Sequence, residues 1–211
     1  MPKSMLVTGA SAGIGAATAI LASEQGWDIG VGYNSDAVGA EKTCAAIRKN
    51  GQTAHAIQAD MADPTQIAKM FETFNKTFGP MSAFTNNAGI VMPKSRFEDI
   101  SQDRLETIFR INTLGAFTAA QHAVRAMAHH HGGAGGAIVN VSSVAASKGG
   151  ATEYVDYAAT KGAMDTMTKG LALELATQGV RVNAVRPGII DTDIHAKGGQ
   201  PGRADRIAPT I

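Results

Sequence analysis

Short apolar runs alternate along the chain with longer segments of helical periodicity. Six runs have the composition of strands and end at turn-forming residues: MLVTG, DIGVGY, TAHAIQAD, MSAFTNN, GAIVNVSS and VRVNAVRP. The segments between them are long enough for helices that cross from one strand to the next. This alternation predicts a single α/β domain over residues 1–211, in which a parallel sheet with helices on both faces forms the middle of three layers.

The helical segments carry boundary signals of their own. A helix over residues 64–78 begins at an Asp-Pro pair, which supplies a cap and a first-turn proline, and ends at a Gly-Pro pair. A longer apolar pattern predicts one helix from about residue 101 to about residue 130, with Asn112 on its apolar side. A third helix is expected over residues 154–177.

Composition and charge exclude several kinds of partner. The 211 residues carry 19 basic and 18 acidic side chains, a formal net charge of +1, without a long run of either sign. Nucleic acid and anionic membrane surfaces are therefore disfavoured, and no run reaches the ~20 apolar residues of a membrane span. The single cysteine, Cys44, lacks a partner for a disulfide or a zinc site and has the spacing of a buried helical residue. We expect a soluble, cytosolic protein that uses no metal.

A glycine-rich loop follows the first predicted strand and precedes an alanine-rich helix. Gly9, Gly13 and Gly15 have the spacing GxxxGxG rather than the GxGxxG of the general dinucleotide fingerprint. Glycine allows the tight turn and lets backbone N–H groups approach a pyrophosphate, which the helix N-terminus also attracts. In the first unit of an alternating fold, such a loop predicts a dinucleotide site. Its contact residues would be Gly9, Ser11, Ala12, Gly13, Ile14 and Gly15.

The end of the second predicted strand favours one coenzyme over the other. An acidic residue there would accept hydrogen bonds from the adenosine 2′-hydroxyl and repel a 2′-phosphate. This sequence has Tyr33 at that position, followed by Asn34 and Ser35, which can both donate hydrogen bonds to a phosphate. We expect NADP as the preferred coenzyme. NAD is the alternative, since no arginine or lysine follows the strand and Asp36 lies close by.

A tyrosine and a lysine share one face of the third predicted helix. Tyr157 and Lys161 are four residues apart, whereas Tyr154 has only Ala158 at that spacing. The stripe continues through mainly apolar residues, so it faces the protein interior. An ammonium ~5 Å from a phenol, at an effective dielectric constant of ~20, would favour the phenolate by roughly 3 kcal/mol, or about two pKa units. Burial acts in the opposite direction on both groups, and the alternative interpretation is a surface tyrosine beside a solvated lysine.

Two serines end the fifth predicted strand, at the carboxyl edge of the sheet where doubly wound folds bind ligands. Ser143 could lie beside the Tyr157 phenol and hydrogen-bond a substrate oxygen, with Ser142 as the alternative. Serines at a strand end are also ordinary turn residues. Their significance therefore depends on the tyrosine and the lysine.

Six motifs together resemble the short-chain dehydrogenase/reductase superfamily, in the order that this family shows and over nearly the whole chain. They are Thr8-Gly9-Ala10-Ser11-Ala12-Gly13-Ile14-Gly15, Asn86-Asn87-Ala88-Gly89, Asn112, Ser143, Tyr157-xxx-Lys161 and Pro187-Gly188. The resemblance implies a Rossmann-type doubly wound sheet and reversible hydride transfer between a nicotinamide and a carbonyl or secondary alcohol. A weaker likeness is to bacterial sugar dehydrogenases and 3-oxoacyl carrier-protein reductases.

The resemblance also implies a role for each matching residue. Tyr157 would protonate the carbonyl oxygen or take the hydroxyl proton, Lys161 would lower its pKa and hold the nicotinamide ribose, and Ser143 would orient the substrate oxygen. Asn112 would break its helix locally and connect the lysine to solvent through water; a merely structural buried asparagine is the alternative. Further coenzyme contacts would come from Asp60 and Met61 at the adenine, Asn87, Ala88 and Gly89 at the adenosine ribose, and Pro187, Gly188, Ile190 and Thr192 at the nicotinamide end. Gly89 could instead serve only the turn after its strand.

The C-terminal part departs from the family pattern. Members usually continue through another helix and a seventh strand, whereas this chain ends at GGQPGRADRIAPTI. Either the natural protein is longer, which we favour, or the sheet lacks an edge strand. Residues 191–211, glycine-rich and polar between 197 and 203, suit a mobile lid over the substrate. The resemblance further implies a homotetramer or dimer, with the two long predicted helices as interface candidates.

Four weaker features admit structural interpretations. The consecutive histidines 129–131 would be splayed around a helix rather than converge on a metal, so a solvated helix end is expected. His195 lies in the predicted lid and could touch substrate. Trp27 and Tyr154 are expected to pack in the core, with a place in the substrate cleft as the alternative for Tyr154.

A protein that binds a dinucleotide only as a sensor or an interaction module is the alternative to an enzyme. The combination of Ser143, Tyr157 and Lys161 argues against it, because a pure binding protein does not need a proton relay.

Overall fold

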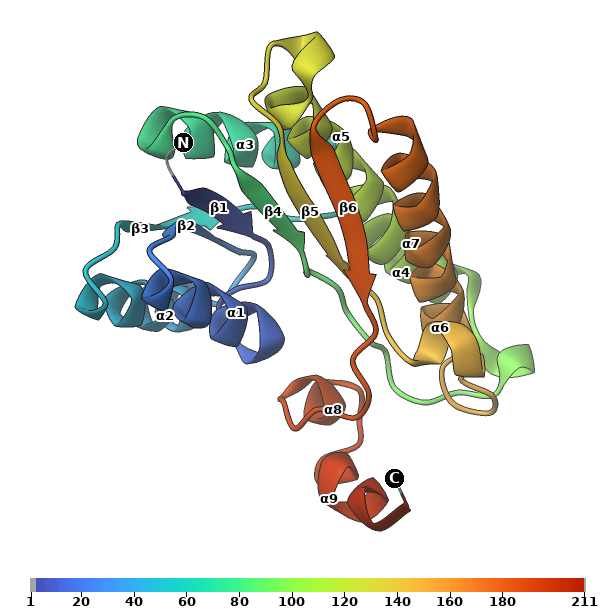
Figure 1. The fold of residues 1–211 in the computed structure, drawn as a ribbon. Coiled ribbons are helices and arrows are strands. Elements are labelled where there is room, and N and C mark those ends of the chain that lie inside the picture. The colour runs from blue at the N-terminus through green and yellow to red at the C-terminus, as the bar shows by residue number, and fades with distance from the viewer. Residues whose placement is uncertain (1–2, 211) are drawn as a thin grey trace.

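A six-stranded, fully parallel sheet organises the computed structural model, which describes residues 3–210 (Figure 1). The strands are β1 (Ser4–Val7), β2 (Asp28–Tyr33), β3 (Ala54–Gln58), β4 (Ala83–Asn86), β5 (Gly136–Val141) and β6 (Val180–Val185). Their order, β3-β2-β1-β4-β5-β6, confirms the predicted Rossmann-type sheet. The chain reverses its direction of winding between β1 and β4, which is where such sheets open a crevice for a ligand.

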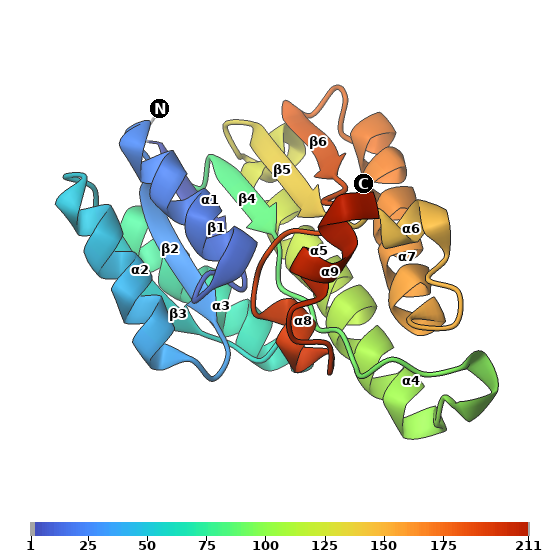
Figure 2. The same cartoon turned by 90° about the horizontal axis from the view of Figure 1, so that it is seen from below.

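Helices cover both faces of the sheet, so the domain has the three predicted layers (Figures 1 and 2). On one face lie α1 (Gly13–Glu24) and α2 (Ala37–Lys49), whose apolar residues pack with those of β1 and β2. The other face carries α3 (Pro64–Phe78), α5 (Ala116–Met127) and α7 (Val155–Glu174), which enclose the larger core cluster. Shorter helices are α4 (Gln102–Phe109), α6 (Ala145–Lys148), α8 (Ile194–Lys197) and α9 (Arg203–Ile207).

The helix predicted over residues 64–78 is confirmed residue by residue in α3. The Asp63 carboxylate accepts the backbone N–H of Thr65 at 2.8 Å and that of Gln66 at 3.3 Å, and so caps the helix. At the other end, Gly79 adopts φ 74°, a left-handed conformation that favours glycine.

The long helix predicted for residues 101–130 is interrupted around Asn112, where the family resemblance implied a local break. It divides into α4, a π-helical turn (η2, Arg110–Gly115) and α5, which ends at Met127 before a short 3₁₀ turn over His129–His131. A π turn inserts an extra residue into the helix, and here it holds Asn112 at 0% exposure. The last residue of the turn lies very close to the neighbouring backbone, because a Cβ at Gly115 would be 2.1 Å from the Met61 carbonyl oxygen.

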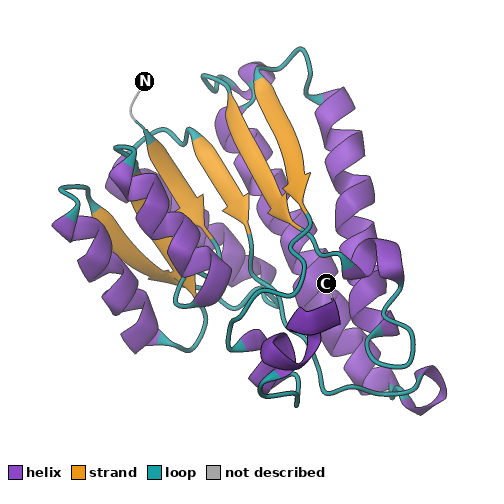
Figure 3. Ribbon diagram, turned by 60° about the horizontal axis from the view of Figure 1, so that its bottom comes forward, coloured by secondary structure: helices purple, strands orange, loops and turns teal. Residues whose placement is uncertain are grey.

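The C-terminal segment lies beyond the carboxyl ends of β4, β5 and β6 (Figure 3). It forms α8, α9 and a final 3₁₀ turn (η4, Ala208–Thr210). Within residues 3–210, no helix combines the length and apolarity needed to cross a membrane.

Candidate active site

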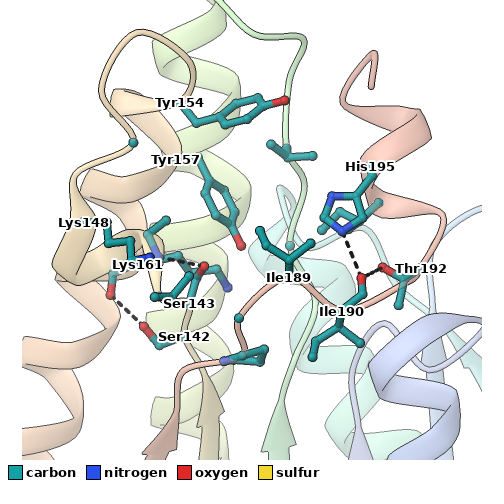
Figure 4. Close-up of a pocket in the computed structure, with 18 of the residues that line it drawn as sticks. Ser142, Ser143, Lys148, Tyr154, Tyr157, Lys161, Ile189, Ile190, Thr192 and His195 are labelled. Carbon is teal, nitrogen blue, oxygen red and sulfur yellow. Dashed lines mark hydrogen bonds between the residues drawn. The ribbon is translucent and has the colours of Figure 1, made fainter. Parts of the chain in front are cut away.

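Two adjoining cavities open at the carboxyl edge of the sheet. One, of about 330 Å³, lies against the glycine loop and the end of β2. The other, of about 700 Å³, lies between the first turn of α7, the loop after β6 and the C-terminal helices (Figure 4). The cavities have five lining residues in common, so a ligand longer than either cavity can occupy both: Ile14, Asn87, Gly89, Thr192 and Ile194.

The glycine loop has the backbone that sequence analysis required. Gly9 and Gly13 have φ values of 64° and 55°, which favour glycine. A Cβ at Gly15 would lie 2.3 Å from the Gly9 carbonyl oxygen, so that position has no room for a side chain. As far as the described residues show, no side chain caps α1 and its first turn holds no acidic residue. The N-terminal amides of the helix therefore fit an anion such as a pyrophosphate.

Thr8 and Asn87 join the glycine loop to the loop after β4. The Thr8 hydroxyl accepts the backbone N–H groups of Asn87 and Ala88, each at 3.0 Å. The Asn87 amide in turn donates to the carbonyl oxygens of Thr8 at 2.8 Å and Gly9 at 3.1 Å. Thr8 belongs to the recognised motif, but its place as the link between two coenzyme loops was not predicted.

The predicted coenzyme residues divide between the two cavities. Those of the smaller cavity are Gly9, Ser11, Ala12, Gly13, Ile14, Gly15, Tyr33, Asn34, Ser35, Asp60, Met61, Asn87, Ala88 and Gly89. Those of the larger cavity are Tyr157, Lys161, Pro187, Gly188, Ile190 and Thr192, and Ile14, Asn87 and Gly89 border it as well. Asp36 also borders the smaller cavity, but its carboxylate accepts the backbone N–H of Gly39 at 2.9 Å and caps α2.

Tyr157, Ser143 and Lys161 meet at the larger cavity. The Tyr157 hydroxyl points into the space between Ser143 and Ile189 (Figure 4), and the Ser143 side chain acts to lower the pKa of the phenol. Lys161 is 3% exposed, and its Nζ donates to the Val141 carbonyl oxygen at 2.7 Å and lies 5.7 Å from the centre of the tyrosine ring.

The two serines have different partners. The Ser142 hydroxyl donates to the Lys161 carbonyl oxygen at 3.2 Å and is therefore committed to the backbone of α7. Ser143 is the serine beside the phenol, as the first of the two alternatives predicted.

The expected lowering of the Tyr157 pKa is wrong for this arrangement. Burial raises the pKa of Tyr157, and the Ser143 side chain opposes this rise. Burial also lowers the pKa of Lys161 to about 8, although the Asp165 carboxylate one turn further along α7 acts in the opposite direction. The lysine points at a carbonyl oxygen rather than at the phenol, and so desolvation outweighs its attraction for the phenolate.

Asn112 lies behind the cavities rather than in their walls, as judged from the residues described. Its side-chain amide donates to the Ile90 carbonyl oxygen and accepts the Ile90 N–H, both at 2.8 Å. A Cβ at Gly89 would be 3.3 Å from Asn112 Oδ1 and 3.6 Å from Lys161 Nζ. The asparagine and the lysine therefore both lie beside this glycine, on the inner side of the site.

Several wall residues of the larger cavity come from the C-terminal segment. His195 borders it, with Nε2 2.9 Å from the Ile190 carbonyl oxygen. Arg203, which sequence analysis did not select, pairs with Glu153 at 2.6 Å and lies over the Tyr154 ring, 5.0 Å from its centre. No local pattern marks this pair, because its members are 50 residues apart in the chain.

The remaining residues that the sequence singled out mostly have structural roles. Tyr154 is 6% exposed yet also borders the larger cavity, so both interpretations of it apply. Trp27 packs against the core beside β2, and Cys44 is buried, with its pKa raised to about 11 mainly by burial. The histidines 129–131 are exposed in a 3₁₀ turn, as expected of a solvated helix end.

Comparison with known proteins identifies the relatives of this site and fold. A family model described as short chain dehydrogenase matches residues 3–201. An uncharacterized oxidoreductase, YgfF, of Escherichia coli strain K12 is 46% identical over 206 residues, which cover 98% of this chain and 83% of that protein. Versicolorin reductase stcU of Emericella nidulans is 38% identical over 192 residues, 91% of this chain and 70% of that protein. A short chain dehydrogenase from Burkholderia cenocepacia, solved in complex with NADP, superposes with a TM-score of 0.87 at 33% identity and covers 98% of this chain and 81% of its own.

Proposed function

Because this chain belongs to the short chain dehydrogenase family, we propose that it transfers hydride between a nicotinamide coenzyme and a carbonyl or secondary alcohol. The observation that carries this proposal is the Tyr157 phenol, which lies beside Ser143 and is directed into the larger cavity, next to the cavity at the glycine loop. A proton donor beside a dinucleotide site is what carbonyl reduction requires.

The chain would supply the proton and the orientation of the substrate. In reduction, the Tyr157 hydroxyl donates its proton to the substrate oxygen while the Ser143 hydroxyl holds that oxygen in place. In oxidation, the phenolate accepts the hydroxyl proton. The coenzyme supplies or accepts the hydride when it is bound. Since burial raises the Tyr157 pKa, the phenol carries its proton at neutral pH and is ready to act as an acid. Lys161 would bind the nicotinamide ribose, with Asn112 behind it.

We infer that NADP is the preferred coenzyme. Tyr33, Asn34 and Ser35 border the smaller cavity where a carboxylate would select the 2′-hydroxyl of NAD. The acidic residue that follows Ser35 in the chain, Asp36, is occupied as the cap of α2. The Burkholderia cenocepacia neighbour, which was solved with NADP, supports this assignment.

Residues 191–211 would act as a lid over the substrate. Support comes from Thr192, His195 and Arg203, which border the larger cavity, and from the ion pair of Arg203 with Glu153. A substrate that enters this cavity would leave little of its surface in water, which favours hydride transfer over side reactions.

A homo-oligomer, dimer or tetramer, would form through the α5 and α7 layer. Large apolar side chains are exposed there: Leu114 at 62%, Phe117 at 40% and Leu173 at 81%. On α7, a Cβ added at Gly162 or Gly170 would meet nothing within 4 Å in the part of the chain that the structure describes. Open helix surfaces with exposed apolar side chains are typical of contact surfaces between protein chains.

Substitution of the phenol tests the proposed function. The carbonyl panel consists of diacetyl, an aryl ketone and a 3-oxoacyl thioester, each assayed by oxidation of NADPH, and sugars are assayed by reduction of NADP⁺. Tyr157→Phe should lower the rates of both reactions by at least about 100-fold. The affinities for NADPH and NADH, measured by titration of coenzyme fluorescence, should change little and should favour NADPH. Tyr154→Phe, the same chemical change at the other tyrosine of the cavity, should retain activity within about tenfold.

Two results would contradict the proposal. A Tyr157→Phe variant with most of the parental rate would exclude the phenol as the proton donor. Binding of NADPH without turnover of any compound on the panel would favour a sensor or interaction protein.

A further inference from the structure

A buried ion pair lies next to Tyr157 but outside the cavities. The Arg104 Nε is 2.6 Å from Asp156 Oδ2, and a second hydrogen bond of 3.2 Å joins Arg104 Nη2 to Asp156 Oδ1. The aspartate side chain is 0% exposed and the arginine side chain 13%. Neither residue is among the described residues that border either cavity. A direct contact with substrate or coenzyme therefore does not explain the pair.

The aspartate belongs to the first turn of the helix that carries the phenol. Asp156 Oδ1 accepts the backbone N–H of Tyr157 at 2.9 Å. Tyr154, at the N-cap of α7, makes no side-chain cap within the described structure, so the Asp156 carboxylate satisfies this free amide. A negative charge in the first turn is also favoured by the helix dipole. The position of the Tyr157 backbone thus depends on where the aspartate is held.

Arg104 also binds the loop that forms part of the wall of the larger cavity. Its Nη1 donates to the carbonyl oxygen of Pro93, in the loop over residues 87–96 that follows β4. The same loop contributes Gly89 and Val91 to the wall of the larger cavity. One guanidinium on α4 therefore connects the start of α7 with the loop across the cavity. A backbone hydrogen bond of 3.0 Å, from the Ser95 N–H to the Glu153 carbonyl oxygen, also joins this loop to the residues before α7.

We propose that Arg104 and Asp156 are positioning residues, which fix the Tyr157 phenol relative to the loop over residues 87–96. The inference rests on the proposed function, in which that phenol transfers a proton. A planar guanidinium that forms two hydrogen bonds with a carboxylate and a third with a carbonyl oxygen fixes orientation as well as distance. Proton transfer is sensitive to displacements of about 1 Å. Loss of the pair should therefore lower kcat far more than it weakens coenzyme binding.

A double variant separates positioning from folding. A single substitution would leave one buried charge unpaired and risk unfolding, whereas an apolar pair of similar volume is tolerated at many buried ion pairs. Arg104→Met with Asp156→Leu removes both charges and the hydrogen bonds to Tyr157 and Pro93. The matched control is Arg48→Met with Glu41→Leu, which removes an exposed ion pair on α2.

The measurements are kcat and KM on the most active compound of the carbonyl panel, NADPH affinity by fluorescence, and hydrogen exchange of the NADPH-bound proteins. For the folded Arg104/Asp156 double variant we expect kcat about 10- to 100-fold lower, NADPH affinity within about threefold of the parent, and faster exchange in residues 87–96 and 150–161. The control should match the parent in all three. Arg104→Lys, which keeps the charge but not the planar fork, should give an intermediate kcat.

A folded double variant with parental kcat and parental exchange would overturn the inference. If the double variant does not fold, Arg104→Lys decides, and a folded lysine variant with parental kcat overturns it. Should the parent turn over no compound on the panel, the proposed function fails. The exchange measurement still tests whether the pair holds the two segments, and unchanged exchange would then reject the inference separately.

Discussion

At the scale of single residues, two adjacent serines after β5 have different roles: one stabilises the fold, and the other lies beside the proposed proton donor. Ser142 is 3% exposed and bonds to the backbone of α7, whereas Ser143 lies beside the Tyr157 phenol. The same substitution at the two positions removes the same hydroxyl from different partners. The chain therefore contains its own control for the role of the serine hydroxyl at the phenol.

Ser143→Ala should shift the pH dependence of alcohol oxidation to more alkaline values and lower kcat by about 100-fold. Oxidation needs the Tyr157 phenolate, which forms above the phenol pKa. The Ser143 side chain lowers that pKa against the effect of burial. Its loss therefore raises the pKa, and the oxidation rate rises only at a higher pH. Reduction needs the protonated phenol and should persist to higher pH in the variant.

Profiles of kcat/KM from about pH 6 to about pH 11 measure this shift, because burial raises the pKa of Tyr157 above its ordinary value of about 10. Ser142→Ala should leave the alkaline limb of the profile in place. An identical displacement in both serine variants would show that the effect comes from a general change at the strand end, not from the phenol.

The residue scale also shows what local sequence reasoning could not reach. The spacing of Tyr157 and Lys161 places them correctly on one face of α7, because helical periodicity is a local property. The direction of the tyrosine pKa depends instead on burial, which raises it, and on the Ser143 side chain, which acts in the opposite direction. Both are set by strands and loops far away in the chain. The shared helix face of Tyr157 and Lys161 was predictable from the sequence, but the balance of burial and charge at the phenol was not.

At the scale of elements, two predictions made from periodicity differ in outcome for a physical reason. The helix over residues 64–78 has strong cap and stop signals, and α3 matches it at both ends. The long helix over residues 101–130 breaks where Asn112 binds the Ile90 backbone and Gly115 packs against Met61. Those contacts are tertiary, so apolar periodicity alone did not reveal the break, whereas the resemblance to the dehydrogenase family placed it at Asn112.

The C-terminal segment is held to the start of the Tyr157 helix by a second polar cluster. Arg203 pairs with Glu153, and Gln200 Nε2 donates to the Tyr154 hydroxyl at 2.6 Å. Gln200 is itself 6% exposed. The proposed lid would stay closed only as long as these contacts with Glu153 and Tyr154 are kept.

Arg203→Met should loosen the proposed lid and raise KM for the carbonyl substrate about three- to tenfold, with a smaller change in kcat. The substitution keeps most of the side-chain volume over the Tyr154 ring but removes the ion pair with Glu153 and the cation–π contact. Limited digestion with trypsin should also cut the segment after Lys197 faster than in the parent. Arg96→Met, which breaks an exposed pair with Glu98, is the control. Unchanged KM and unchanged digestion in Arg203→Met would exclude the ion pair as the latch of a lid.

At the scale of the whole molecule, both helical layers expose large apolar side chains to water. These are Leu114 and Leu173 in the layer with α5 and α7, and Leu21 and Val38 on α1 and α2. Scattered exposed leucines occur on many monomers, so exposure alone does not identify the interface. The open glycine positions of α7 distinguish its layer, because small residues allow a second helix to approach closely.

Leu114→Glu with Leu173→Glu should therefore convert a dimer or tetramer into monomers, since each acidic side chain would be buried without a partner in an α5 and α7 interface. The matched control, Leu21→Glu with Val38→Glu, changes side chains of similar exposure, 61% and 69%, on the opposite layer and should keep the parental mass. Sedimentation equilibrium gives the mass of all three proteins. A parent that sediments as a monomer would reject the proposed assembly. Dissociation in the control alone would move the interface to α1 and α2, because the layer that loses contacts on acquiring charge is the layer that is buried between subunits.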